Sequence, residues 1–206
     1  EAGISHTNGA TTAVTLPFDI NTTGGGVRVK RTDSTGDWIC LDTDSDTLYW
    51  KWNDVAASAS FSDGGFTTNT FTLSGDFATG TYLLEAFAQG EYFDHLGYAG
   101  NSANRTLSLN QTLDSAPGFV AAWSLTSSTH ENVGWHSSIA NTEWIRIDTT
   151  AAKATWTQVW NSTTPTTTGV TVGPTDNVNK TGSTHRMWVW ANSGPYAFGE
   201  FTGNNN

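Results

Sequence analysis

The amino-acid sequence predicts an all-β protein composed of two tandem antiparallel β-sandwich domains with a jelly-roll-like topology. The composition is typical of strands and turns, because the 206 residues include 21 Gly, 10 Trp and 10 Phe, and only 14% are charged. Apolar residues alternate with a period of two, and no window sustains the period of an amphipathic helix. The strand-like runs of the first half also recur, in the same order, in the second half.

The first half contains short strand-like runs separated by turn residues. The second run, at residues 27–30, alternates Val with a basic residue, and residues 38–41 have the pattern of a buried strand that carries the single cysteine, Cys40. Residues 71–73 follow a polar turn, and residues 81–87 show the clearest alternation of this half. A lone cysteine can form no internal disulfide, so Cys40 is expected to fill a core as a small hydrophobic residue.

The same landmarks recur in the second half. Residues 120–123 repeat residues 27–30 at an offset of 93, and residues 147–149 repeat residues 41–43 at an offset of 106. Residues 170–172, 190–191 and 201–204 repeat 71–73, 87–88 and 98–101, and the clear strand at 186–190 corresponds to 81–87. A period of this length is the size of a small domain, whereas solenoid units have roughly 20 to 50 residues. We therefore predict one sandwich at residues 1–100 and a second at residues 101–206.

The predicted junction at residues 101–107 has no Pro- or Gly-rich linker, so the two sandwiches are expected to form a fairly rigid pair. Residues 201–204 repeat the junction motif of residues 98–101, and the first residue, Glu1, is not a start methionine. These two features predict that the sequence is a processed or truncated piece of a longer array.

The charge and hydropathy of the chain argue against two classes of partner. The net charge is −10 and there are only nine Lys and Arg residues, whereas nucleic-acid binding requires clustered basic residues. No apolar run approaches the roughly 20 residues of a membrane-spanning helix. We predict neither nucleic acid nor a membrane as a partner.

The sequence also predicts that the protein is not an enzyme. The carboxylates of the strands are too dispersed to form the pair that glycoside hydrolysis needs, and no Gly-x-Ser-x-Gly motif occurs. His130 and His136 flank a Gly-Trp turn, where they could share a metal ion or be two ordinary surface histidines. No cofactor is expected, and calcium is the one candidate metal ion.

An acidic run gives the sequence its candidate metal site. Asp42, Asp44 and Asp46 alternate along the chain, and calcium prefers six to eight oxygen ligands, which such a turn can supply. Thr47 and Asn53 stand where an EF-hand loop would have Gly and Glu, so the run is no EF-hand. The alternative is a solvated hairpin turn, which the second half favours because residues 148–150 there are Asp-Thr-Thr.

The tryptophans suggest a different ligand. Flat aromatic side chains in β-sandwich carbohydrate-binding modules stack on sugar rings. The pairs Trp50/Trp52 and Trp188/Trp190 each share one strand face, and the bulk that a sandwich core needs favours core positions for them. Trp135, which lies between Gly134 and His136 in a polar stretch, is the candidate exposed ring for a glycan.

Several motifs together resemble an uncharacterised domain family of tailed-bacteriophage virion proteins. They are the strand ends with Asp-Thr, the run Gly80–Ala88, the run Trp156–Trp160 with residues 161–166 after it, and the closing aromatic-x-Gly-Asn. The segment at residues 32–39 is shorter than the family pattern. The resemblance implies a jelly-roll-like domain that occurs in tandem in virion components, and it carries no catalytic residues because its motifs are structural.

These observations favour a non-enzymatic virion structural protein on the virion surface, either a head decoration protein or a tail appendage or fibre component. Its expected partners are other capsid or tail proteins and further copies of itself. The alternative is a carbohydrate-binding or adhesion module that recognises a host surface glycan, and a third class is a calcium-dependent surface-layer or adhesin repeat. The same fold serves at the head and at the tail, so the sequence leaves the location open.

Overall fold

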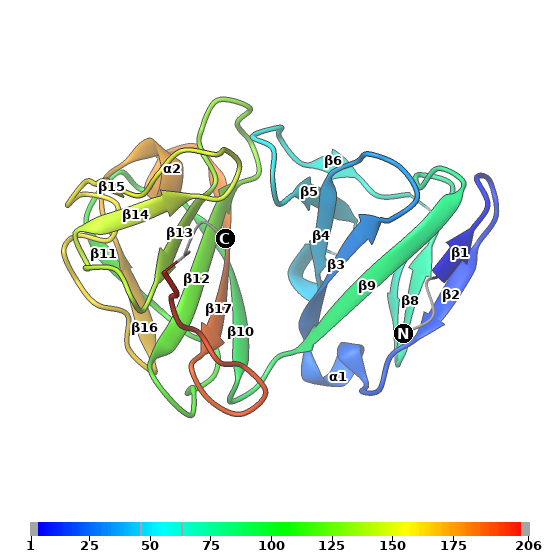
Figure 1. Ribbon diagram of the computed structural model, residues 1–206, viewed down its shortest axis with the longest axis horizontal. Coiled ribbons are helices and arrows are strands. Elements are labelled where there is room, and N and C mark those ends of the chain that lie inside the picture. The colour runs from blue at the N-terminus through cyan, green and yellow to red at the C-terminus, as the bar shows by residue number, and fades with distance from the viewer. Residues whose placement is uncertain (1–3, 46, 63, 203–206) are drawn as a thin grey trace.

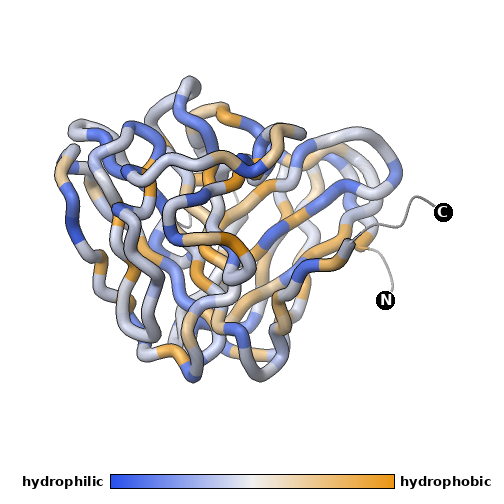
Figure 2. Tube along the Cα trace, turned by 60° about the vertical axis from the view of Figure 1, so that its left-hand side comes forward, coloured by the Kyte–Doolittle hydropathy of each residue, from blue (hydrophilic) through white to orange (hydrophobic). Residues whose placement is uncertain are grey.

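The structure is a computed structural model that describes residues 4–45, 47–62 and 64–202. Antiparallel strands dominate it and form two lobes that lie side by side (Figure 1). Hydrophobic residues recur along the chain between hydrophilic ones (Figure 2), and many of them are buried. The predicted class, all-β with two antiparallel sandwich-like domains, is confirmed.

The first lobe packs a six-stranded sheet on a three-stranded sheet. The large sheet has the order β1-β9-β3-β4-β5-β6 and the small sheet the order β2-β8-β7. The strands are β1 (Ile4–His6), β2 (Thr12–Thr15), β3 (Gly25–Arg31), β4 (Trp38–Asp42), β5 (Leu48–Lys51), β6 (Ala59–Ser60), β7 (Gly65–Thr67), β8 (Thr70–Leu73) and β9 (Gly80–Ala88). A helical turn, α1 (Ile20–Thr23), and a 3-10 turn at Thr43–Ser45 connect them.

The second lobe packs a six-stranded sheet on a two-stranded ribbon. The large sheet has the order β10-β17-β12-β13-β14-β15, and the ribbon pairs β11 with β16. The strands are β10 (Phe93–Ala99), β11 (Arg105–Ser108), β12 (Pro117–Ser124), β13 (Val133–His136), β14 (Glu143–Arg146), β15 (Ala154–Thr155), β16 (Gly169–Val172) and β17 (Thr184–Ala191), with the helical turn α2 (Asp176–Asn179) before β17. Neither four-residue helix is long and apolar enough to cross a membrane, and the described residues contain no other α-helix.

The two large sheets have the same strand order when each is counted from its first strand. Strand β1 corresponds to β10, β9 to β17, and β3 to β12. In the same order, β4, β5 and β6 correspond to β13, β14 and β15. The chain passes from one sheet to the other between Ala88 and Phe93, since β10 pairs with β17 over its whole length. The changeover therefore precedes residue 100, where the sequence places the end of the first domain.

Three hydrophobic cores lie across the molecule, and alternate residues of single strands belong to different cores. In β12, Val120 and Ala122 face the core of the second sandwich, whereas Ala121 and Trp123 face the first lobe. This division follows from the two-residue period of side chains along a strand. The large sheet of each lobe is consequently covered on both faces, by its own small sheet and by the large sheet of the other lobe.

Candidate functional site

The contact between the lobes is a core of aromatic side chains, which we call the central aromatic core. Its buried members are Cys40, Trp50, Phe93, Ala121, Trp123, Leu125, Trp188 and Trp190. Trp50 of the first sheet meets Trp188 of the second edge-on, with ring centroids 5.7 Å apart. Close approach depends on Gly26 of β3, where a β-carbon would lie only 2.7 Å from the Trp188 ring. The core interpretation of Trp50, Trp188 and Trp190 is confirmed, since each is 5% exposed or less.

At one margin of the central aromatic core the sheets diverge and leave a cleft of about 390 Å³. This aromatic cleft is lined by side chains from both large sheets and from the segment after β17: Arg28, Trp52, Phe87, Phe119, His136, Trp190, Tyr196 and Phe198. Its volume falls within the roughly 300–1,000 Å³ range of small-molecule sites, and its walls are mainly apolar, as such sites usually are. The cleft is therefore the candidate functional site.

Arg28 is the arginine among the residues that line the aromatic cleft. Its guanidinium lies over the Trp38 ring at 4.4 Å and over the Trp52 ring at 4.6 Å from the centroids. The same group forms an ion pair with Glu85 of the neighbouring strand at 2.5 Å. Two cation–π contacts and one ion pair hold the guanidinium in place. Arg28 can therefore present a fixed N–H edge, while Glu85 neutralises its charge.

The segment that follows β17 forms the outer wall of the aromatic cleft. Phe198 stacks on Phe119 with centroids 6.1 Å apart and an interplanar angle of 15°, and it meets His136 edge-on. The backbone N–H of Phe198 donates to the Asn192 Oδ1 at 2.9 Å. Gly118 provides the space, since a β-carbon there would lie 2.2 Å from the Phe198 ring. The wall is thus anchored to the second sheet.

The cleft has the chemistry of a binding site for a flat ligand. Aromatic faces offer apolar area and a stacking surface, and the Arg28, His136 and Tyr196 side chains offer hydrogen-bonding groups at its margin. Neither a carboxylate nor a thiol is among its eight lining residues. Stacking and hydrogen bonding are therefore what these residues can do.

Asp42, one of the three predicted calcium ligands, is buried between the lobes and has protein partners. Its carboxylate accepts hydrogen bonds from the Ser45 hydroxyl at 3.0 Å and from the Trp188 indole N–H at 3.2 Å. The Arg186 Nε of the second sheet lies 3.4 Å away. Gly97 makes room for this guanidinium, because a β-carbon at Gly97 would collide with it. The carboxylate therefore connects two sheets.

Asp44, the second predicted calcium ligand, lies near Arg186 as Asp42 does, and also near His95. Its carboxylate lies 3.5 Å from His95 Nδ1 and 3.7 Å from Arg186 Nη1. Interaction with His95 lowers the pKa of Asp44. Burial lowers the pKa of the His95 imidazole, but the carboxylates of Asp44, Asp42 and Asp94 outweigh burial and raise it above its ordinary value.

The calcium site predicted at this turn stays a prediction, although two of its three ligands have protein partners. Asp42 and Asp44 face an arginine and a histidine, which neutralise the charge that would attract a cation. Asp46 lies outside the described residues. Within the residues that the structure describes, no group of three or more His, Cys, Asp or Glu side chains is arranged to hold a metal ion. His130 lies near Asp176, whereas His136 lines the aromatic cleft.

The prediction that Trp135 is an exposed ring is wrong. Trp135 is 4% exposed and belongs to the core of the second sandwich. It alternates in β13 with Gly134, so its ring points to the inner face although its sequence neighbours are polar or small. The large hydrophobic residues that are exposed in the described chain are Trp156, at 41%, and Phe201, at 93%.

The aromatic cleft is not predicted by the sequence patterns. Arg28 and Phe119 belong to strands, where their alternation indicates only one face of a sheet. Arg28 and Phe119 come together only because two sheets, formed by different parts of the chain, pack against each other. One signal was available, since residues 196–201 carry three aromatic residues outside any predicted strand.

The fold and the cleft define an all-β protein of two sandwiches that share an aromatic core. The chain belongs to the family described as "Domain of unknown function (DUF7483)", whose profile matches residues 42–206. The matched region begins at the end of β4 and includes the whole second lobe. Comparisons with curated proteins and with solved structures found no match.

Proposed function

We propose that the chain is a non-enzymatic structural protein of a bacteriophage virion, either a head decoration protein or part of a tail appendage or fibre. The observation that carries the proposal is the central aromatic core. It joins the large sheets of both lobes through tryptophans that are almost fully buried, such as Trp50, Trp123 and Trp188. A spacer or lattice element has to hold its two ends at a fixed distance and orientation. A hydrophobic core shared by two domains restricts their relative motion and so provides this rigidity.

Two further properties fit this proposal. The net charge of −10 keeps a protein soluble when many copies are displayed together. The candidate site, the aromatic cleft, contains no carboxylate pair among its lining residues, which fits a role without hydrolysis.

The proposal is tested by the amount of this polypeptide in purified phage particles whose genome encodes it. Quantitative mass spectrometry against the major capsid protein gives the copy number. Tens to hundreds of copies in a simple ratio to capsid subunits indicate head decoration, and a few to a few dozen indicate a tail appendage. Absence from the particles would overturn the virion role.

The aromatic cleft favours a second function, the binding of a saccharide. A pyranose ring has an apolar face that stacks on indole and phenyl rings and hydroxyls that reach polar side chains. Trp52, Phe119 and Phe198 supply such rings, and Arg28 and His136 supply polar groups. On a virion, this cleft would recognise a host surface glycan.

Titration calorimetry with oligosaccharides from host surface polysaccharides tests the saccharide function. Phe198→Ala should weaken binding at least tenfold, because it removes one wall of the cleft. Trp156→Ala is the matched control, since this exposed tryptophan is not among the residues that line the cleft. An equal loss of affinity in both variants, or no binding across the panel, would exclude the cleft as a glycan site.

A further inference from the structure

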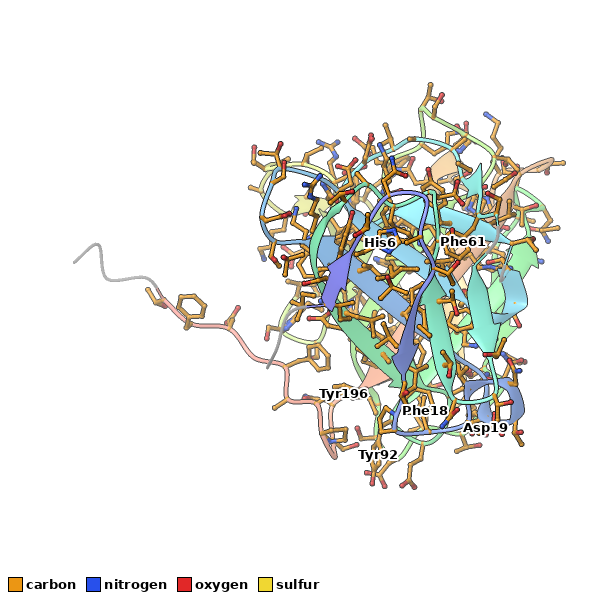
Figure 3. All side chains as sticks on the ribbon, turned by 90° about the vertical axis from the view of Figure 1, so that its right-hand side faces the viewer. His6, Phe18, Asp19, Phe61, Tyr92 and Tyr196 are labelled. Carbon is orange, nitrogen blue, oxygen red and sulfur yellow. The ribbon has the colours of Figure 1, made fainter. Side chains whose placement is uncertain are left out.

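The segment from Tyr196 to Thr202 has the sequence of a strand, yet it belongs to no strand here. It aligns with residues 93–99 without a gap, 103 positions later, and has a ring-bearing side chain at the same three positions: Tyr196 for Phe93, Phe198 for His95 and Phe201 for Tyr98. Phe198 still packs on Phe119, and after it the segment extends away from the rest of the molecule (Figure 3). Phe201 is 93% exposed, which is unusual for a phenylalanine. The segment is therefore a strand sequence without a sheet.

Residues 93–99 show what such a segment does when it has a partner. They form β10, the edge strand of the second sheet, and pair antiparallel with β17 from Phe93 opposite Trp190 to Ala99 opposite Thr184. Tyr98 of this strand stacks on His185 and packs against the core of the second sandwich. The partner of this type of segment is thus the last strand of a sandwich.

Strand β9, the last strand of the first lobe, offers the matching edge. It corresponds to β17 in strand order and by the same 103-residue offset. On the side where β17 carries the seven-residue β10, β9 carries β1, which has three residues and pairs with Gly80 to Tyr82. Among the described residues, none pairs on that side with Leu83 to Phe87.

We propose that the segment Tyr196–Thr202 of one copy adds as an antiparallel edge strand to β9 of a second copy, in place of β1. The register transfers from β10 and β17, with Tyr196 opposite Phe87 and Thr202 opposite Thr81. Seven backbone pairs replace three. Phe201 takes the position of Ile4, which packs against the core of the first sandwich, and so becomes covered. Addition of a strand to a sheet edge is a general mode of protein association.

The acceptor is a second copy because the segment of the same chain turns away from β9 after its first residue. Tyr196 lies near Phe87 of β9, with ring centroids 6.4 Å apart, but Phe198 stacks on Phe119 of β12, which belongs to the second lobe. Donation requires Tyr196 and Phe198 to leave the aromatic cleft, so donation opens the cleft of the donor. Each copy has one donor and one acceptor on different lobes, so the contact is head-to-tail and can extend into a row of copies.

Disulfide trapping tests the register. Ala86→Cys and Ala197→Cys place two thiols opposite each other in the proposed pairing, at a Cα separation that a disulfide can span. The native Cys40 does not interfere, because it is buried and burial raises the pKa of its thiol well above the ordinary value. When the two single variants of the full chain are mixed and oxidised, we expect a covalent dimer.

Two controls make the trapping decisive. Ala10→Cys mixed with Ala86→Cys should give no dimer, because Ala10 is exposed but lies outside the segment. The double variant Ala86→Cys/Ala197→Cys should form ladders of linked chains. A double variant that closes only within one chain, or single variants that do not cross-link above the control, would overturn the proposal.

Sedimentation velocity over a range of concentrations measures the association itself. Phe201→Asp should weaken self-association at least tenfold and leave the melting temperature of the monomer unchanged, since the ring is exposed there. Trp156→Asp, which changes the other exposed large hydrophobic residue, should associate as the unmodified chain does. A chain that is monomeric at all concentrations, or equal effects of the two substitutions, would refute strand donation.

Discussion

Trp188 connects the two lobes through both its ring and its indole N–H. The ring is fully buried beside Trp50 and Trp123, and the N–H donates to the Asp42 carboxylate of the first sheet. Trp188→Phe keeps most of the apolar contact but leaves this buried carboxylate one donor short. We expect a loss of about 1–3 kcal/mol in the free energy of unfolding, measured by urea denaturation. Trp156→Phe, at an exposed position, should change it by less than about 0.5 kcal/mol. Equal effects would show that the indole N–H contributes nothing.

His185 makes the stability of the protein depend on pH. Burial lowers its pKa from 6.5 to about 4, with a further contribution from the charge of His130. Between these values the unfolded chain binds a proton that the folded chain excludes, so stability is present above pH 6.5 and is lost as the pH falls towards 4. A shift of this size corresponds to about 3 kcal/mol of stability. His185→Phe, which retains a ring against Tyr98, should flatten the profile of unfolding free energy in this window. An unchanged slope would mean that His185 is charged in the folded state.

At the scale of elements, strand β3 shows why the sheets approach so closely. Gly26 stands where the Trp188 ring crosses the strand, and a larger side chain would have to push the ring aside. Gly26→Val should therefore lower the free energy of unfolding by about 1–3 kcal/mol, as overpacking of a core usually does. Gly36→Val is the control, since a β-carbon there has no atom nearer than 4.0 Å, and it should be neutral within about 0.5 kcal/mol. If Gly26→Val had the same free energy of unfolding as the unmodified chain, the two sheets would be able to move apart at this point without losing stability.

The sequence was most informative about single elements. Alternation located β9 and β17, and their shared offset of 103 agrees with their equal place in the two sheets. It was misleading at residues 41–43, which were matched with 147–149 after β14, whereas β4 corresponds in strand order to β13. Contacts between residues far apart along the chain determine which core each strand face meets. A period of two tells which residues share a face, but both faces of β12 are buried, and no local pattern shows which core each face meets.

At the scale of the whole molecule, the candidate site exists only because the lobes are fused. Arg28 and Phe87 come from the first sheet, Phe119 and His136 from the second, and the aromatic cleft lies between them. The prediction of a rigid pair rested on the segment at residues 101–107, whereas the chain crosses between the large sheets at residues 89–92. Besides the connection at residues 89–92, the lobes share the central aromatic core and the ion pairs of Asp42 and Asp44 with Arg186.

A shared core of this kind predicts that the two lobes unfold together. Scanning calorimetry should give one transition whose calorimetric and van't Hoff enthalpies agree. Val170→Ala removes methyl groups from the second sandwich core and Val27→Ala from the first, each at a fully buried position, at a cost of about 2 kcal/mol. If the central aromatic core couples the lobes, each variant lowers the midpoint of the whole transition, and amide exchange in β8 of the first lobe accelerates even when the change is in the second. Two independent domains would behave differently: the transition would split, and each substitution would shift only its own half, because the other lobe would keep its stability when its neighbour unfolds.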